Sequence, residues 1–144
     1  MDAPISDFRG GFKFLSNFYI ADVSYDGVTY PSTEHAYQAA KTTDALERQK
    51  VLTTPTCFKA KRMGMQVTLR PDWDAIKLGI MEDLIRQKFT RHQDLREQLL
   101  ATGTKELVEG NTWGDTYWGV CNGKGQNQLG KILMKVRSEL AALV

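Results

Sequence analysis

With 144 residues, of which 42% are hydrophobic and 25% charged, the chain has the length and balance of one compact domain, which we expect over residues 1–144. Its 19 Lys and Arg against 17 Asp and Glu leave a net charge of +2, which is too small to indicate nucleic-acid binding through charge. Cys57 and Cys121 form no CxxC pair, so a zinc site is not expected, and lone thiols favour a reducing, cytoplasmic compartment. No segment approaches the roughly 18 apolar residues of a membrane span, and the first residues lack the apolar run of a signal peptide.

The first predicted element is a β-hairpin. Its strands are Ile20–Tyr25 and the segment from Val28 to Tyr30, joined by Asp26-Gly27, a pair that supplies the positive φ angles of a tight turn. Ser32 is a natural N-cap, and it predicts a helix from about Thr33 to Lys41.

The rest of the chain reads mainly as helix. Further helices are expected over Asp44–Leu52, from Thr56 to about Met63, from Pro71-Asp72 to Phe89, over Asp94–Ala101, and at the chain end with Leu129, Ile132, Leu133, Val136, Leu140 and Leu143 facing the core. Glu106–Glu109 is a strand candidate, and Gly110–Gln128 reads as an ordered loop. The predicted fold class is α+β, a predominantly α-helical single domain with a small N-terminal β-hairpin and short strands. The chain contains neither the GxGxxG fingerprint of a Rossmann fold nor a GxxxxGK[ST] phosphate loop.

The segment Tyr30–Lys41 holds the first candidate site. Glu34, Gln38 and Lys41 fall within about 60° of one another on a helix of 100° per residue, so a carboxylate, an amide and an amine share one face. The alternative is an exposed face with an ordinary Glu–Lys pair.

Two aromatic segments are the other candidates. Asn17 lies among Phe14, Phe18 and Tyr19, where rings can stack on a base and the amide can contact a base edge or a ribose hydroxyl. The loop Asn111–Gly130 is rich in Trp and Gly, and its end leads into the last helix, where backbone N–H groups favour a phosphate. A core-capping segment and a purely structural loop are the respective alternatives.

Two carboxylates, Glu34 and Asp115, each stand beside aromatic residues. This combination is typical of glycosidic chemistry, in which an ionised carboxylate stabilises an oxocarbenium-like state while another group handles protons. Their separation in sequence leaves open whether they meet in space.

These segments are also where the chain resembles the NADAR (YbiA-like) family, from about Phe8 to Leu140. The matching elements, in chain order, are Leu15–Tyr19, then Ser32 with Glu34, His35, Gln38 and Lys41, then Trp73, then Lys88-Phe89, then Asp115 with Trp118 and Gly119, and lastly Gly125 with Asn127, Leu129, Gly130, Leu133 and Met134. Each element alone is modest, but six in order at matching spacing make a strong resemblance. One departure is Met65, where members often carry an Arg, with Arg62 nearby.

The resemblance implies an α+β, mostly helical fold and hydrolysis of an N-glycosidic bond between ribose and a base, with no metal and no organic cofactor. Family substrates include phosphoribosylamino-pyrimidine intermediates of riboflavin synthesis and ADP-ribose on guanine in nucleic acid. Some members occur beside ADP-ribosylating toxins, so a functional pairing with such a toxin is a possible partner relation.

The residue roles expected from this reading fall into two sets. The catalytic set is Glu34 as general acid/base or electrostatic stabiliser, Asp115 toward the ribose or the attacking water, and Lys41 as a phosphate-neutralising charge or as the attacking amine. The substrate-binding set is Asn17, Phe18, His35, Gln38, Arg62, Trp73, Trp118, Gly119 and Asn127. Two alternatives remain: a non-catalytic module that binds ADP-ribose or NAD derivatives, and a nucleic-acid adaptor, which the small net charge disfavours.

Overall fold

The computed structural model describes residues 3–144, which form two compact units. One unit is Asn17–Arg91, and the other combines the described residues before it with His92–Val144. The sequence shows no linker at either boundary, and the prediction of one domain over residues 1–144 stays a prediction.

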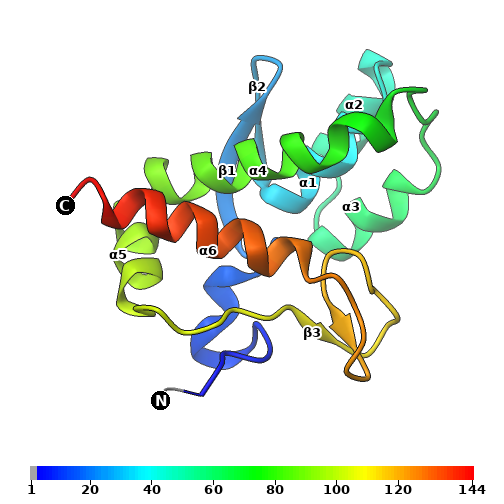
Figure 1. Ribbon diagram of the computed structural model, residues 1–144. Coiled ribbons are helices and arrows are strands. Elements are labelled where there is room, and N and C mark those ends of the chain that lie inside the picture. Colours follow the sequence, from blue (N-terminus) through cyan, green and yellow to red (C-terminus); the bar gives the residue numbers. More distant parts are fainter. Residues whose placement is uncertain (1–2) are drawn as a thin grey trace. The chain divides into compact units, whose positions relative to one another are not determined.

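The unit Asn17–Arg91 is an antiparallel hairpin with four helices (Figure 1). Its elements are β1 (Ile20–Tyr25), β2 (Val28–Ser32), α1 (Thr33–Ala40), α2 (Ala45–Leu52), α3 (Cys57–Gly64) and α4 (Trp73–Arg91). Both turn residues have positive φ, 48° at Asp26 and 78° at Gly27, as a two-residue hairpin of this hand requires. The predicted hairpin and its turn are therefore confirmed.

The first three helices of this unit begin at side-chain caps. The oxygens of Ser32, Asp44 and Thr56 accept hydrogen bonds from backbone N–H groups three residues further on, at 3.1, 2.9 and 3.1 Å. Each satisfies a donor that the first helical turn leaves without an intrahelical partner. The predicted starts of these helices are correct to within one residue.

The second unit holds the remaining elements. These are a 3₁₀ helix η1 (Gly10–Leu15), α5 (Gln93–Ala101), β3 (Gly110–Asn111), β4 (Val120–Cys121) and α6 (Gln128–Ala141). Strands β3 and β4 pair in parallel inside the segment predicted as a loop. The apolar side of α6 is buried as expected, with Leu129, Ile132, Leu133, Val136 and Leu140 inside.

Two sequence expectations in this unit are wrong. Glu106–Glu109 is not a strand: Leu107 forms only an isolated parallel bridge with Ile5, and pairing in β3 begins at Gly110. Leu143 does not face the core, because α6 ends at Ala141 and the Leu143 side chain is exposed. The predominantly helical α+β class with a small hairpin and short strands is confirmed.

Candidate active site

Helix α1 is a polar helix that is buried on every side. All eight of its residues are buried, and it contacts both strands of the hairpin as well as α2, α3 and α4. Glu34 is only 7% exposed and Gln38 only 4%. A solvated Glu–Lys surface pair is therefore the wrong description of this segment, since buried carboxylates are rare without a specific role or partner.

The Glu34 carboxylate is held from its own helix. Gln38 lies one turn further on, and its Nε2 donates to Glu34 Oε2 at 2.5 Å. The backbone N–H of Glu34 donates to the carbonyl oxygen of Asn17 at 3.1 Å. The geometry thus brings Asn17, Glu34 and Gln38 together, as the sequence predicted for the last two.

Residues next to Glu34 in the chain or bonded to it carry buried polar atoms that lack a partner. Within residues 3–144, the buried side-chain atoms without a hydrogen-bond partner are Asn17 Oδ1, Thr33 Oγ1 and Gln38 Oε1. Thr33 precedes Glu34 in the chain, and the other two residues bond to Glu34 as described. A buried polar group left unpaired costs about 1–3 kcal/mol, so three of them on residues that adjoin or bond to Glu34 favour a ligand-binding role for this part of the unit.

Lys41 caps the C-terminal end of α1 and is half-buried. Burial lowers the pKa of its amine below the ordinary value; Glu34 opposes this shift, and Lys61 and Lys77 add to it. Its Nζ lies 5.7 Å from the centre of the Tyr37 ring. Lys41 therefore combines access to solvent with a weakened hold on its proton, which suits either role expected for it.

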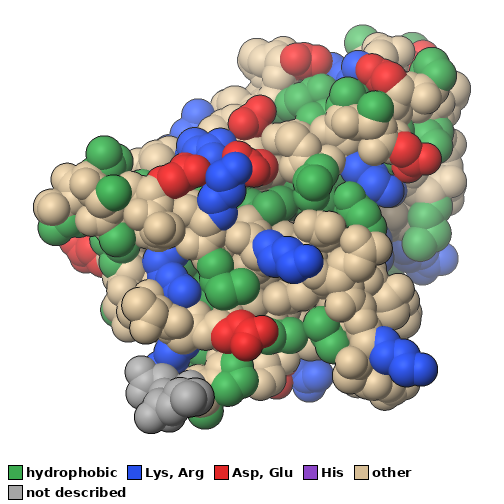
Figure 2. Space-filling model, in the orientation of Figure 1, with side chains coloured by type: hydrophobic (Ala, Val, Ile, Leu, Met, Phe, Trp, Pro, Cys, Tyr) green, Lys and Arg blue, Asp and Glu red, His purple; other side chains and the backbone are tan. Residues whose placement is uncertain are grey.

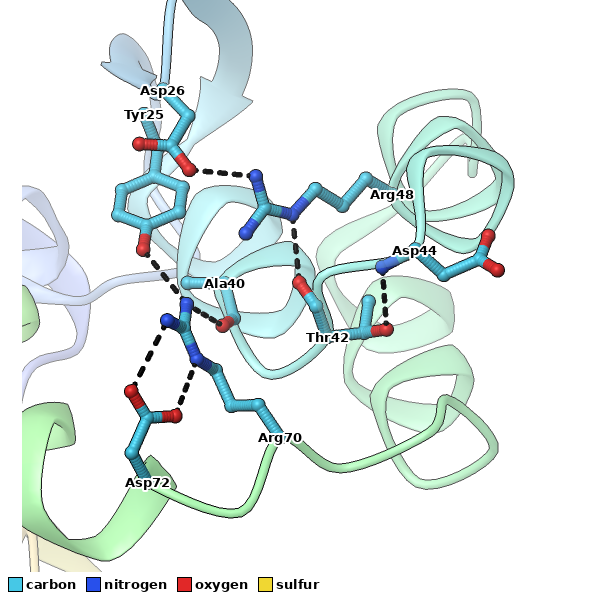
Figure 3. A network of polar contacts seen from close by, with 8 residues as sticks. All are labelled: Tyr25, Asp26, Ala40, Thr42, Asp44, Arg48, Arg70 and Asp72. Carbon is cyan, nitrogen blue, oxygen red and sulfur yellow. Dashed lines mark hydrogen bonds and ion pairs between the residues drawn. The ribbon is translucent and has the colours of Figure 1, made fainter.

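Two arginines fix the backbone where α1 ends (Figure 3). Arg70 forms an ion pair with Asp72 at 2.7 Å and donates to the Ala40 carbonyl at 3.4 Å, and its backbone N–H donates to the Lys41 carbonyl at 2.8 Å. Arg48 bonds to the Thr42 carbonyl at 2.7 Å and pairs with Asp26 at 2.8 Å. The backbone of Lys41 is thus held by hydrogen bonds to three consecutive carbonyl groups, those of Ala40, Lys41 and Thr42.

Lys88 is a functional candidate that the sequence reading left without a role. Its side chain has no exposed surface, and its Nζ lies 5.6 Å from the Tyr19 ring centre and 5.2 Å from that of Phe89. Burial lowers the pKa of Lys88 from 10.5 to about 7, against an opposing effect of Cys57. Its position among Leu84, Ile85 and Phe89 on the apolar face of α4 was the available signal, since an amine rarely occupies a core position.

His35 is engaged within the protein through both ring nitrogens. Nε2 lies 3.0 Å from the Thr54 carbonyl, which can only accept, so this nitrogen carries the proton. Nδ1 lies 2.7 Å from Ser32 Oγ, and the Cys57 thiol donates to the same oxygen at 3.2 Å. A substrate contact by His35 would have to displace one of these bonds; that role stays a prediction.

The other expected binding residues of this unit differ in exposure. The Trp73 indole is buried, with its ring centre 5.1 Å from that of Tyr37, so it already packs in the core. Phe18 is 41% exposed, and exposed Arg62 lies over the Phe58 ring at 5.9 Å. Phe18 and Arg62 are open to solvent, whereas Trp73 is as buried as Glu34 and Gln38; the binding roles of all three stay predictions.

Asp115 belongs to the second unit and organises its own loop. Its Oδ1 accepts from the backbone N–H groups of Tyr117 and Trp118 at 3.1 and 2.9 Å. Asn111 brackets it, accepting from its N–H at 3.0 Å and donating to its carbonyl at 2.9 Å. One carboxylate oxygen thus shapes the turn that carries Trp118, and the catalytic role of Asp115 stays a prediction.

Three backbone N–H groups at the start of α6 are bonded within the protein, and a phosphate contact at this helix start stays a prediction. The backbone N–H groups of Asn127, Gln128 and Leu129 donate to the carbonyls of Gly119, Tyr117 and Trp118, at 3.2, 3.1 and 2.9 Å. The Asn127 side chain bonds to the backbone of Glu109 and Leu107. Half-buried Trp118 packs edge-on against Tyr117, with ring centres 4.8 Å apart. These backbone N–H groups and the Asn127 side chain thus join the preceding loop to the start of α6.

The described residues present no cluster of three or more His, Cys, Asp or Glu that is arranged to hold a metal ion. None of the helices in that part of the chain has the length and apolarity to cross a membrane.

On the face drawn in Figure 2, basic and acidic side chains are interspersed rather than gathered into one basic patch. This face therefore lacks the broad positive surface on which a nucleic-acid adaptor depends.

Comparisons with known proteins show which family the chain resembles over most of its length. The model of the NADAR domain matches residues 7–141. The N-glycosidase YbiA of Escherichia coli strain K12 is 40% identical over 139 residues, which cover 94% of this chain and 84% of that protein. A riboflavin biosynthesis protein of Vibrio vulnificus is 42% identical over 130 residues, covering 88% of this chain and 35% of that protein.

A solved structure agrees with the sequence matches. The NMR structure of the E. coli protein YbiA superposes with a TM-score of 0.85 at 37% identity, covering 99% of this chain and 88% of that one. An N-glycosidase of Nostoc punctiforme is 38% identical over 136 residues, covering 90% of this chain and 86% of that protein. The fold, the family model and the relatives all agree, and the chain belongs to the NADAR family.

Proposed function

We propose that this chain is a hydrolase that cleaves the N-glycosidic bond between ribose and a base in a nucleotide-like substrate, with Glu34 at the reacting bond. The observation that carries the proposal is the surroundings of Glu34. The carboxylate is buried and oriented by Gln38 at 2.5 Å, and three residues that adjoin it in the chain or bond to it, Thr33, Asn17 and Gln38, each carry a buried polar atom without a partner. Family membership and relatives named as N-glycosidases support the same reaction.

The chemistry needs a carboxylate of this kind. Loss of a base from ribose passes through an oxocarbenium-like state, whose positive charge a nearby ionised carboxylate stabilises. That stabilisation is larger in a site shielded from water, and it requires that the carboxylate is already oriented. Asn17 Oδ1 is an acceptor without a partner, and a ribose hydroxyl is a donor that such an acceptor binds.

Lys41 completes the proposed site in one of two ways. As a cation it neutralises the phosphate of a nucleotide-like substrate. As a neutral amine it attacks C1 of the opened sugar; the bond from C1 to the base nitrogen breaks, the base leaves with a proton, and water hydrolyses the resulting Schiff base to the free sugar and the amine. The lowered pKa of Lys41 favours the second role, whereas the opposing effect of Glu34 favours the first.

The proposed substrates are a phosphoribosylamino-pyrimidine intermediate of riboflavin synthesis and ADP-ribose linked to guanine in nucleic acid. The match to a riboflavin biosynthesis protein supports the first. The test is mass spectrometry of the products from a panel: a phosphoribosylamino-pyrimidine, NAD, ADP-ribose and ADP-ribosyl-guanine DNA. Hydrolysis of the glycosidic bond is the expected result with one of them: a free pyrimidine and ribose phosphate from the first, nicotinamide and ADP-ribose from NAD, adenine from ADP-ribose, or ADP-ribose and guanine-containing DNA from the last.

The alternative is a non-catalytic module for ADP-ribose or NAD derivatives. Such a module has no use for a buried carboxylate, which repels the phosphates of its ligand. Calorimetry with the same panel separates the two: binding of ADP-ribose or NAD without cleavage of any panel compound would establish the module and reject the hydrolase.

A further inference from the structure

Helix α3 packs against α1 through small side chains. The buried residues of α3 are Cys57, Ala60 and Gly64, which recur at the three- and four-residue spacing of one helix face. Cys57 Sγ lies 3.2 Å from Ser32 Oγ before the start of α1, and Gly64 lies against Gln38 near its end. The two helices therefore run in the same direction, with Gly64 beside the amide that holds Glu34.

The space at Gly64 is filled by that amide. A Cβ built on Gly64 would lie 2.6 Å from Gln38 Cδ and 3.1 Å from Gln38 Cβ, and closer still to Gln38 Oε1. Real Cβ atoms are essentially never found as close as this to Cδ and Oε1, so a side chain at position 64 has to move the Gln38 amide. Gln38 is buried, and with its Nε2 bonded to Glu34 at 2.5 Å, it cannot swing into solvent without breaking that bond.

We infer that Gly64 is a positioning residue for the Glu34 carboxylate, because its missing side chain leaves the space in which Gln38 turns its NH₂ group toward Glu34. This inference rests on the proposed function of Glu34. Backbone conformation does not explain the glycine, since Gly64 is helical without a positive φ and helix propensity alone favours Ala. The requirement comes from the contact with Gln38.

The test compares Gly64→Ala with Gly79→Ala. Gly79 is also helical, in α4, and a Cβ there meets nothing within 4 Å, so it gives the same gain in helix propensity without the contact. We expect kcat on the cleaved panel compound to fall at least about tenfold in Gly64→Ala, as loss of a transition-state contact does, with circular dichroism unchanged. Gly79→Ala keeps the wild-type rate.

A second background shows whether Gly64 acts through Gln38. Gln38→Ala removes the amide and makes room for a methyl group at position 64. If the contact is the cause, Gly64→Ala lowers kcat no further in this background, so the two substitutions are strongly non-additive. Additive losses, or an unchanged rate in Gly64→Ala alone, would overturn the inference. The double variant has no overlap at position 64. If Gly64→Ala alone fails to fold, kcat of the double variant can still be compared with kcat of Gln38→Ala.

A spectroscopic measurement needs no substrate. The Gln38 side-chain NH₂ signals, assigned in ¹⁵N-labelled protein by their loss in Gln38→Ala, report the bond to Glu34. We expect Gly64→Ala to shift them and Gly79→Ala to leave them in place; unshifted signals reject the inference. If the wild-type chain cleaves no panel compound but these signals shift, the proposed function fails while the packing relation between Gly64 and Gln38 stands.

Discussion

Replacing Glu34 by Gln removes one charge from the site and almost nothing else. The two side chains have the same shape, and the new amide can turn its oxygen toward Gln38 Nε2, which in the native protein donates to Glu34 at 2.5 Å. The hydrogen bond becomes neutral and weaker, but a buried carboxylate, 7% exposed, no longer has to be desolvated. These effects oppose each other, so we expect the free energy of unfolding to change by no more than about 1 kcal/mol.

Catalysis responds differently, because the oxocarbenium-like state carries a charge that the substrate lacks. A positioned group that acts only in the transition state is worth about 2.7–4 kcal/mol, or a hundred- to a thousandfold in kcat. The assay measures kcat for whichever panel compound is cleaved, and urea unfolding confirms the fold. Glu97→Gln, at an exposed position of α5, is the matched control and keeps its rate. A folded Glu34→Gln enzyme with more than a tenth of the wild-type kcat would refute the proposed role.

The remaining predictions concern three residues. For Lys41, borohydride added during turnover should leave a reduced sugar adduct on this residue if it forms a Schiff base; no adduct together with a retained rate in Lys41→Arg would assign it to charge alone. Asp115→Asn keeps an oxygen for the N–H groups of Tyr117 and Trp118, so we expect a folded loop and, if the charge serves catalysis, at least about a tenfold loss of kcat; an unchanged rate makes Asp115 structural. Burial lowers the pKa of Lys88 from 10.5 in the unfolded chain to about 7 in the folded protein. Between pH 7 and pH 10.5 the unfolded state therefore holds one more proton on Lys88 than the folded state does. The free energy of unfolding rises with pH across this range and is constant below it. Lys88→Met should therefore unfold at higher urea than wild type at pH 7, with a difference that shrinks toward pH 10; a constant difference would show that Lys88 is not held neutral.

The elements with local signals were the predictable part of this fold. Asp26-Gly27 determines its hairpin through backbone conformation, and Ser32, Asp44 and Thr56 start helices through hydrogen bonds that span three residues. These interactions join residues that are close in sequence, so the amino-acid sequence alone is enough to predict them.

The features that the sequence left open depend on contacts between distant segments. Helix α1 combines polar residues with alanines and a tyrosine, and only the elements packed on it decide that the polar side chains are buried as well; its sequence alone allowed both a site and an exposed face. The N–H groups at the start of α6 are occupied by carbonyls of Tyr117 and Trp118, which no residue pattern reveals. The role of Gly64 likewise appears only when Gln38 is placed beside it.

Because α1 is enclosed on all sides, the site and the core of its unit share the same residues. Substitutions at Glu34 or Gln38 that alter the shape of the side chain therefore change stability and chemistry together, unlike the isosteric Glu34→Gln, and such changes are rarely tolerated during divergence. Exposed residues of the same unit, such as Phe18 and Arg62, can change without a large effect on stability. Relatives that act on different nucleotides should therefore differ mainly at exposed positions. Mutant libraries that seek a new substrate should vary these positions and leave α1 intact.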